Sequence, residues 1–294
     1  MKKKILLVLS FLAVIGLSVG GTIAYFTAQD AEVATFTYGN VKIEQLQYER
    51  VVENGEWISM GESNKDQWGY IPDKIQQVTS TQGSAILPAV YQNEKNTMIW
   101  DDRNGSEAAS GEGSHQQSWG QLNAPGSNQL FDDSVRNVVD RFTFVKNTGN
   151  EDAYVRTWVA FEQGNISEEQ YERIIHVNQN ESWWNKIQEI YDYEITDEET
   201  GKVNKYYVIC YEFKGENADN RKAGIQTLSP NAITRPSLLQ FYLDPTTTGE
   251  EVELMDGNGN GQLDVITISQ AVQAEGFNNA QNAFDKAFGT NLPF

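Results

Sequence analysis

The sequence contains few of the residues from which catalytic sites and disulfide frameworks are usually built. Among its 294 residues there is one cysteine, and there are two histidines. A single thiol excludes an internal disulfide framework, and Cys210, inside the alternating segment YYVICYEF, is predicted to be a small core residue. Neither His115 nor His176 belongs to an H-E-x-x-H segment, and no G-x-S-x-G segment occurs. The local motifs of a zincin and of a serine hydrolase are therefore missing.

Positive charge is also scarce. Lys and Arg number 22 against 41 Asp and Glu, which gives a formal net charge of −19. Nucleic acids and anionic lipids are bound by clustered Lys and Arg, so this balance argues against both as partners. A secreted chain that repels copies of itself fits the charge better.

The first residues have the three parts of a secretory signal peptide. Three lysines follow Met1, the apolar run ILLVLSFLAVIGLSV comes next, and small residues follow it. We expect residues 1–25 to be the signal peptide and 26–294 to be the mature chain. Removing three lysines and no acid takes the formal charge from −19 to −22. The alternative is an uncleaved membrane anchor, because about 20 apolar residues can span a bilayer.

The mature chain reads mainly as β-strands. Segments of alternating apolar and polar residues, rich in β-branched and aromatic types, are separated by turn-like segments such as KNTGNED and TDEETGKVN. This pattern predicts an all-β fold, a single antiparallel β-sandwich or jelly roll. The segments are 41–52, 138–149, 153–163, 186–195, 205–215, 237–244 and 264–276.

Two segments are predicted to be helices. ISEEQYERIIHVN (166–178) has Ser167 as a helix-capping residue. Near the C-terminus, NNAQNAFDKAFG places apolar side chains at helical spacing, and Gly289 can end the helix. We expect this short C-terminal helix to dock on the sandwich through Ala280, Ala283, Phe284, Ala287 and Phe288.

Residues 53–135 differ from the rest. They are rich in Gly, Ser, Asn and Gln, with isolated tryptophans, and they predict a long loop-rich insertion between two strands. Long loops of this kind are usually functional or disordered. The tryptophans indicate that part of the insertion packs; they are Trp57, Trp68, Trp100 and Trp119.

One segment has the spacing of a metal-binding loop. In DGNGNGQLD, oxygen-bearing side chains occupy positions 1, 3, 5 and 9 and glycine occupies position 6, as at the start of a calcium loop. Position 12, where an acid belongs, is Thr267. The favoured alternative is a Gly-Asn hairpin turn between VELM and DVITIS. The candidate calcium ligands are Asp256, Asn258, Asn260 and Asp264.

Three further segments carry a recognisable pattern. They are the leader and first strand GGTIAYFTAQDAEVATFTYGNVKIE, the turn and strand KNTGNEDAYVR (146–156), and the closing strand and helix ITISQAVQAEGFNNAQNAFDKAFG (266–289). Together they resemble the exported proteins processed by the dedicated signal peptidase SipW. That family includes TasA, a fibre protein of the biofilm matrix, and camelysin, described as a surface metalloprotease.

The resemblance implies a jelly-roll-like sandwich, export from a Gram-positive cell with a SipW-type signal peptidase as partner, and a place in the extracellular matrix or on the cell surface. It also implies a cut at Ala24-Tyr25 or Tyr25-Phe26. The small-residue rule, with Thr22 at −3 and Ala24 at −1, favours the first. Contact with the membrane is then limited to the leader before cleavage.

Cleavage would free an extended and partly apolar end. Such an end can add as a strand to the open sheet edge of another copy, or of a related matrix protein. Head-to-tail addition does not close, so it produces fibres. The alternative is that this segment is the first strand of its own domain. The residues offered for strand addition are Phe26, Ala28, Val33, Phe36 and Tyr38.

We therefore expect a secreted structural protein that is not an enzyme and has no cofactor, apart from the calcium loop considered above. Two alternatives belong to other classes. One is a camelysin-like secreted metalloprotease, and the other is a surface adhesin whose Trp-bearing insertion binds glycans or a host protein.

Overall fold

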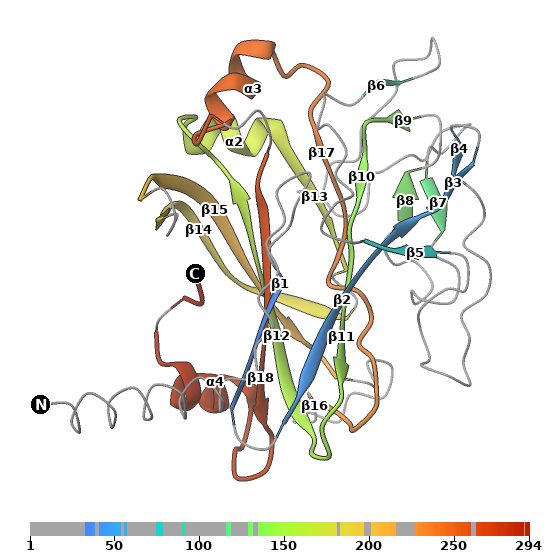
Figure 1. The fold of residues 1–294 in the computed structure, drawn as a ribbon, viewed down its shortest axis with the longest axis vertical. Helices are drawn as coiled ribbons and strands as arrows, with labels where there is room; N and C mark the ends of the chain where they lie inside the picture. Colours follow the sequence, from blue (N-terminus) through green and yellow to red (C-terminus); the bar gives the residue numbers. More distant parts are fainter. Residues whose placement is uncertain are drawn as a thin grey trace, which may run out of the picture.

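The structure of the chain, a computed structural model, is an all-β sandwich with three short helices in its described part (Figure 1). The expected fold class is confirmed, while the jelly-roll connectivity stays a prediction. None of the described helices is long and apolar enough to cross a membrane. The structure describes residues 33–38, 41–53, 56–57, 75–78, 90–91, 116–118, 129–131, 135–180, 183–196, 201–215, 227–259, 263–290 and 292–294.

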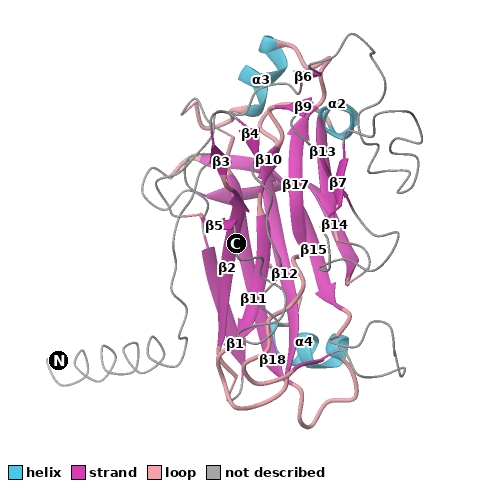
Figure 2. Ribbon diagram, turned by 90° about the vertical axis from the view of Figure 1, so that its right-hand side faces the viewer, coloured by secondary structure: helices cyan, strands magenta, loops and turns pink. Residues whose placement is uncertain are grey.

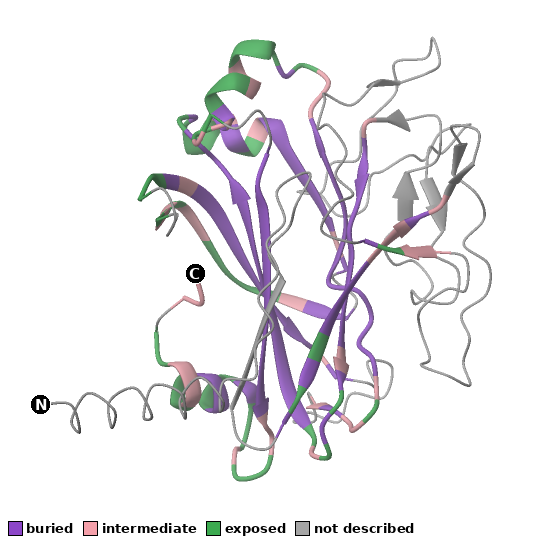
Figure 3. Cartoon of the chain, viewed as in Figure 1, coloured by how far each residue is buried: buried purple, intermediate pink, exposed green. Residues whose placement is uncertain are grey.

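One layer of the sandwich is a six-stranded sheet with the order β1-β18-β12-β15-β14, and β16 also pairs with β12. Its central strands are buried along nearly their whole length (Figure 3). All of its pairs are antiparallel except β1 with β18, which run parallel. The strands are β1 (Val33–Tyr38), β12 (Ala153–Glu162), β14 (Trp184–Thr196), β15 (Val203–Phe213), β16 (Thr227–Leu228) and β18 (Val265–Gln273).

The other layer consists of two three-stranded antiparallel sheets, β10-β17-β13 and β11-β2-β5. They continue one another, because only Arg141 separates β10 from β11 and its N–H donates to the carbonyl of Leu239 at 2.9 Å. The core lies between the two layers, where the rings of Phe161 and Phe241 meet at 5.3 Å. The strands are β2 (Ile43–Arg50), β5 (Ile75–Gln77), β10 (Val139–Asp140), β11 (Phe142–Asn147), β13 (Ile175–Gln179) and β17 (Leu238–Leu243).

In the predicted insertion the structure describes short paired strands. One of them, β5, pairs with β2 and so belongs to the second layer of the sandwich. Of the others, β3 pairs with β4, β6 with β9, and β7 with β8. Trp57 belongs to β4, whereas Trp68, Trp100, Trp119 and His115 lie outside the described residues. The strands are β3 (Val52–Glu53), β4 (Glu56–Trp57), β6 (Val90–Tyr91), β7 (Gln116–Ser118), β8 (Gln129–Phe131) and β9 (Val135–Arg136).

The predicted C-terminal helix is confirmed as α4 (Ala280–Phe288), which ends at Gly289. Ala280, Ala283 and Phe284 are buried against the outer face of the six-stranded sheet. The guanidinium of Arg156 on β12 lies 4.4 Å from the centre of the Phe284 ring, so a cation–π contact adds to the apolar packing. Figure 2 shows α4 against the lower end of the strands.

Two expectations about secondary structure need correction. Ser167 does cap α2 (Glu168–Ile174), in a capping box with Gln170, but the helix ends at Ile174 and not at residue 178. The next five residues form β13, because they pair with β17. The segment VELM, read as one arm of a hairpin, instead ends α3 (Gly249–Met255), which Thr248 caps together with Glu251.

Candidate functional site

The segment expected to become the free end is partly described. Val33, Phe36 and Tyr38 belong to β1, an outer strand that pairs on one side with β18 of its own chain. In this structure the segment therefore pairs within its own chain, which agrees with the alternative that it is the first strand of its own domain. Exchange of this strand between copies stays a prediction. The cleavage residues Ala24, Tyr25 and Phe26, and the strand-addition residue Ala28, lie outside the described residues.

The candidate calcium loop is tied to a buried carboxylate. Glu162, at the end of β12, is fully buried. Its Oε1 accepts the N–H of Gly257 at 2.8 Å, and its Oε2 accepts the N–H of Asp264 at 3.0 Å. The side-chain amide of Asn204 also donates to Glu162. The described part of the loop therefore turns N–H donors inward, toward a carboxyl group that the chain itself supplies.

Of the four calcium candidates, the structure brings Asn258 and Asp264 together. Asp256 ends α3, and the amide of Asn258 donates to Asp264 at 2.7 Å. Asn260 lies outside the described residues. A Cβ on Gly257 would fall 2.0 Å from the Asn204 Oδ1 and 2.9 Å from the Cα of Gly164, so this close approach of two turns needs glycine. Calcium binding here stays a prediction, and no group of three metal-ligating acids, histidines or cysteines occurs among the described residues.

Burial dominates the protonation of Glu162. It raises the pKa of the carboxyl to about 7, and the nearby Asp264 carboxylate adds to the rise. Hydrogen bonds from Asp264, Asn204 and Asn258 oppose it but do not cancel it. The folded chain therefore holds this proton more tightly than the unfolded chain does.

Replacing Glu162 with Gln is expected to flatten the dependence of stability on pH. A raised pKa contributes stability that is complete below about pH 4.5 and is lost as the pH rises through about 7. Across that window we expect the native free energy of unfolding to fall by about 3 kcal/mol more than that of the variant. Urea denaturation at several pH values measures this difference. The exposed substitution Glu169→Gln is the control, and equal slopes for Glu162→Gln and the native chain would contradict the assignment.

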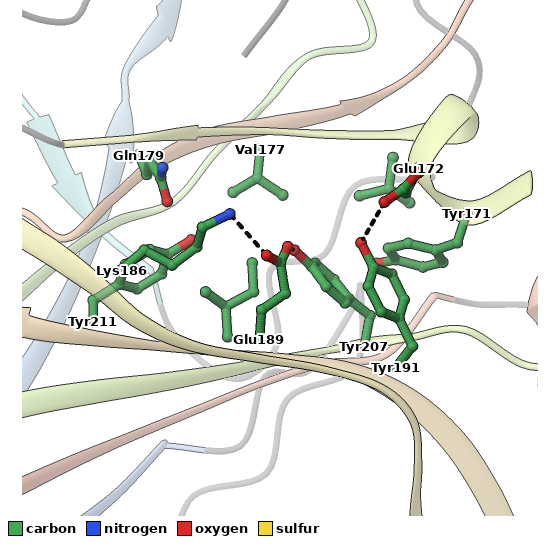
Figure 4. A pocket seen from close by; sticks show the side chains of 11 residues that line it. Tyr171, Glu172, Val177, Gln179, Lys186, Glu189, Tyr191, Tyr207 and Tyr211 are labelled. Carbon is green, nitrogen blue, oxygen red and sulfur yellow. Dashed lines mark hydrogen bonds and ion pairs between the residues drawn. The ribbon is translucent and has the colours of Figure 1, made fainter. Parts of the chain in front are cut away.

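A second feature is a pocket of about 100 Å³ between the two layers (Figure 4). It is lined in part by β13 and β14, which are the outer strands of their sheets. Alternate residues of β15 form its floor, β13 and β14 form its walls, and α2 closes one end. The lining residues are Tyr171, Glu172, Ile175, Val177, Gln179, Lys186, Glu189, Tyr191, Tyr207, Ile209 and Tyr211.

Two β-bulges on β14 shape this pocket. The register against β15 shifts between Lys186 and Gln188, and again between Ile190 and Tyr193. A bulge moves the following side chains to the other face of a strand. As a result Tyr191 stacks on Tyr207 inside the sandwich, with ring centres 4.6 Å apart, while Tyr193 packs on the outer face.

Polar groups at the pocket are mostly paired. The Lys186 Nζ lies 3.0 Å from Glu189, which also accepts the hydroxyl of Tyr207. Tyr191 donates to Glu172 at 3.2 Å. Figure 4 shows these side chains converging from β14, β15 and α2, with two of the contacts dashed.

Tyr171 differs from these neighbours. Tyr171 is 1% exposed, and its hydroxyl has no hydrogen-bond partner among the residues that the structure describes. Burial raises the pKa of Tyr171 well above its ordinary value, and neighbouring Tyr191 and Tyr211 add to the rise, so the group stays a neutral phenol able to donate and accept. A buried hydroxyl without a partner costs stability.

The sequence did not predict this pocket. The feature of the sequence that corresponds to it is a concentration of tyrosines in and beside the hairpin 184–213. Without knowledge of the bulges, these tyrosines are predicted to be ordinary core residues. The expectation that Cys210 is a core residue is confirmed, because it is fully buried. His176 lies on β13, where it stacks on Tyr242 and its Nε2 lies 3.3 Å from Asp244.

Comparisons with protein-family models, with curated proteins and with solved structures found no match to this chain. The class that the fold defines is thus an all-β sandwich with a terminal parallel edge strand.

Proposed function

We propose that the chain is a secreted structural protein of the extracellular matrix or cell surface, and that it assembles by exchanging β1 between copies. The observation that carries this proposal is the position of β1. It is the first described strand, it lies at a sheet edge, and it is the strand nearest to the predicted signal-peptide cut. The resemblance to SipW-processed matrix proteins supports the same reading.

Exchange of β1 conserves its contacts. The strand pairs with β18 from Val33 opposite Thr267 to Tyr38 opposite Val272. An identical strand from another copy would make the same pairs, so exchange changes little apart from the entropy of association. β1 enters the rest of the chain through residues 39–42, which are its single covalent connection to the sandwich.

The strand that receives β1 is held independently of it. β18 pairs with β12 along its whole length. Thr157 of β12 and Ser269 of β18 share a hydrogen bond of 3.1 Å, and Gln45 donates to the carbonyl of Thr267 at 3.2 Å. Three of the β18 positions opposite β1 are polar, namely Thr267, Ser269 and Gln270, so water can solvate them in part while the edge is vacant.

One-way exchange leads to fibres. A copy that gives β1 to a neighbour leaves its own β18 edge open for a third copy, and this head-to-tail contact does not close. Reciprocal exchange between two copies would give a closed dimer. The two outcomes differ in particle length, which makes them separable by microscopy.

The first test uses the secreted protein. Its N-terminus is sequenced, and the same material is imaged by electron microscopy over time. We expect a start at Tyr25 or Phe26 and filaments that lengthen with time. A chain that begins at residue 39 is the control and is expected not to form filaments. A secreted product that keeps the three N-terminal lysines, or that stays monomeric, would contradict the proposal.

A further inference from the structure

We propose that Tyr191 and Tyr207 form an oxidative cross-linking site, at which a one-electron oxidant joins the two rings as dityrosine. The site does not depend on strand exchange, because β14 and β1 lie at opposite edges of the six-stranded sheet. Three properties of the pair support it, which are the contact between the rings, the carboxylates that accept their hydroxyls and the exposure of Tyr191.

The two rings are already in contact. They stack with their centres 4.6 Å apart and their planes at 27°. Tyr191 reaches this position because the register of β14 against β15 shifts between Ile190 and Tyr193. Two groups that a fold holds side by side react as if at very high concentration, so coupling within the pair is favoured over coupling between copies.

Each hydroxyl has a carboxylate in place to take its proton. Tyr207 donates to Glu189, and Tyr191 donates to Glu172 at 3.2 Å (Figure 4). Burial raises the pKa of Tyr191 and of Tyr207, so both stay neutral phenols until an electron leaves. Loss of an electron makes a phenol strongly acidic, and a positioned base within hydrogen-bond distance can then accept the proton directly.

Tyr191 connects the pair to the surface. It is partly exposed and lies on the outer strand of its sheet, whereas Tyr207 is 7% exposed. An oxidant at the surface can take an electron from Tyr191, and the ring contact allows the second oxidation to reach Tyr207. Because Tyr207 is buried, its radical is shielded from water and from other copies.

The reaction balances with two equivalents of a one-electron oxidant, such as a haem peroxidase supplied with hydrogen peroxide. Each ring gives one electron to the oxidant and its phenol proton to the carboxylate, which leaves two neutral phenoxyl radicals. One carbon–carbon bond then forms between the carbons ortho to the two oxygens. The hydrogen on each of these carbons moves to the oxygen of its ring, so the product is dityrosine, with two electrons and two protons removed in all.

The product would fix β14 to β15. A covalent cross-link limits the unfolded chain, so the isolated cross-linked chain is expected to unfold at a higher urea concentration than the unlinked chain. Among the described residues no strand pairs with the other side of β14. Cross-linking therefore secures the edge of the sheet that lies opposite the exchanged strand.

The test is brief photo-oxidation of the mature chain with a ruthenium tris-bipyridine complex and persulfate, which together generate a one-electron oxidant. The monomer band of a denaturing gel is digested with trypsin and analysed by mass spectrometry, so that only links within one chain are counted. We expect a peptide that joins residues 187–202 to residues 206–214, with a mass that is two hydrogen atoms below their sum. Tyr191→Phe and Tyr207→Phe are each expected to lower its yield about 10-fold or more.

Tyr193→Phe and Tyr206→Phe are the matched controls. These tyrosines lie opposite each other on the same two strands but pack on the outer face of the sheet. Each substitution should leave the yield unchanged. Absence of the linked peptide from the native chain would overturn the proposal, and so would a yield that falls as much in the controls as in the Tyr191 and Tyr207 variants.

The proton acceptor is tested by Glu189→Gln. The amide can still accept the hydroxyl of Tyr207 but cannot take its proton, so we expect the initial rate of cross-linking to fall about 10-fold or more. Glu194→Gln replaces an exposed acid on the same strand and is the control. Equal rates for these two variants would overturn the role of Glu189.

Discussion

Replacing Asp140 with alanine is expected to lower the free energy of unfolding by about 3–5 kcal/mol. Asp140 and Arg50 join β10 to β2 in a two-pronged ion pair, with distances of 2.7 and 2.9 Å, and their side chains are 3% and 0% exposed. Gln240 also donates to Asp140 at 2.8 Å. The variant leaves a buried guanidinium without its carboxylate, and a buried charge that loses its partner is strongly destabilising.

Two controls separate this effect from a general loss of charge. Replacing both partners, as Arg50→Met with Asp140→Leu, is expected to cost much less than Asp140→Ala alone, because no buried charge is left unpaired. Lys205→Ala removes an exposed ion pair with Asp192 and is expected to cost no more than about 1 kcal/mol. Urea denaturation of the four proteins measures these differences. Similar losses for Asp140→Ala and Lys205→Ala would contradict the account.

Fixing β1 to its own sheet is expected to abolish filament formation. Thr37 lies directly opposite Ala271 in the β1–β18 register, so the double variant Thr37→Cys with Ala271→Cys can form a disulfide within one chain. A strand that is covalently held cannot be given to a neighbour. The native Cys210 is fully buried, which keeps it out of the reaction.

The same protein provides its own control. Oxidised, it should remain monomeric in electron micrographs and in a sizing column, and addition of a reductant should restore filament growth. Filaments that grow equally well from the oxidised monomer would show that β1 does not need to leave its sheet.

Much of the fold can be predicted from local sequence because its signals are local. The alternation in 153–163 and 205–215 identifies β12 and β15, and the apolar spacing of α4 identifies its buried face. The capping pair Ser167 and Gln170 identifies the start of α2. Thr248 and Glu251 are the same kind of capping pair at the start of α3. The alternation of apolar and polar residues in VELM, however, predicts a strand.

The rest depends on partners that are distant in the chain. Residues 175–179 become a strand only because β17 pairs with them, and the parallel pairing of β1 with β18 joins the two ends of the sequence. The pocket depends on two bulges that reverse which side chains of β14 face inward. Strict two-residue alternation would place Tyr191 and Tyr193 on the same face. In the structure Tyr191 stacks on Tyr207 inside the sandwich and Tyr193 packs on the outer face, and this separation depends on the bulges.

The most direct measurement of strand exchange is a cross-link between different copies. Thr37→Cys and Ala271→Cys are prepared as separate proteins, mixed, allowed to assemble and then oxidised. We predict a disulfide-linked pair that contains one chain of each variant, with residue 37 joined to residue 271, in the filaments and not in monomers. Filaments that contain no such pair would show that β1 of one copy is not seated on β18 of another.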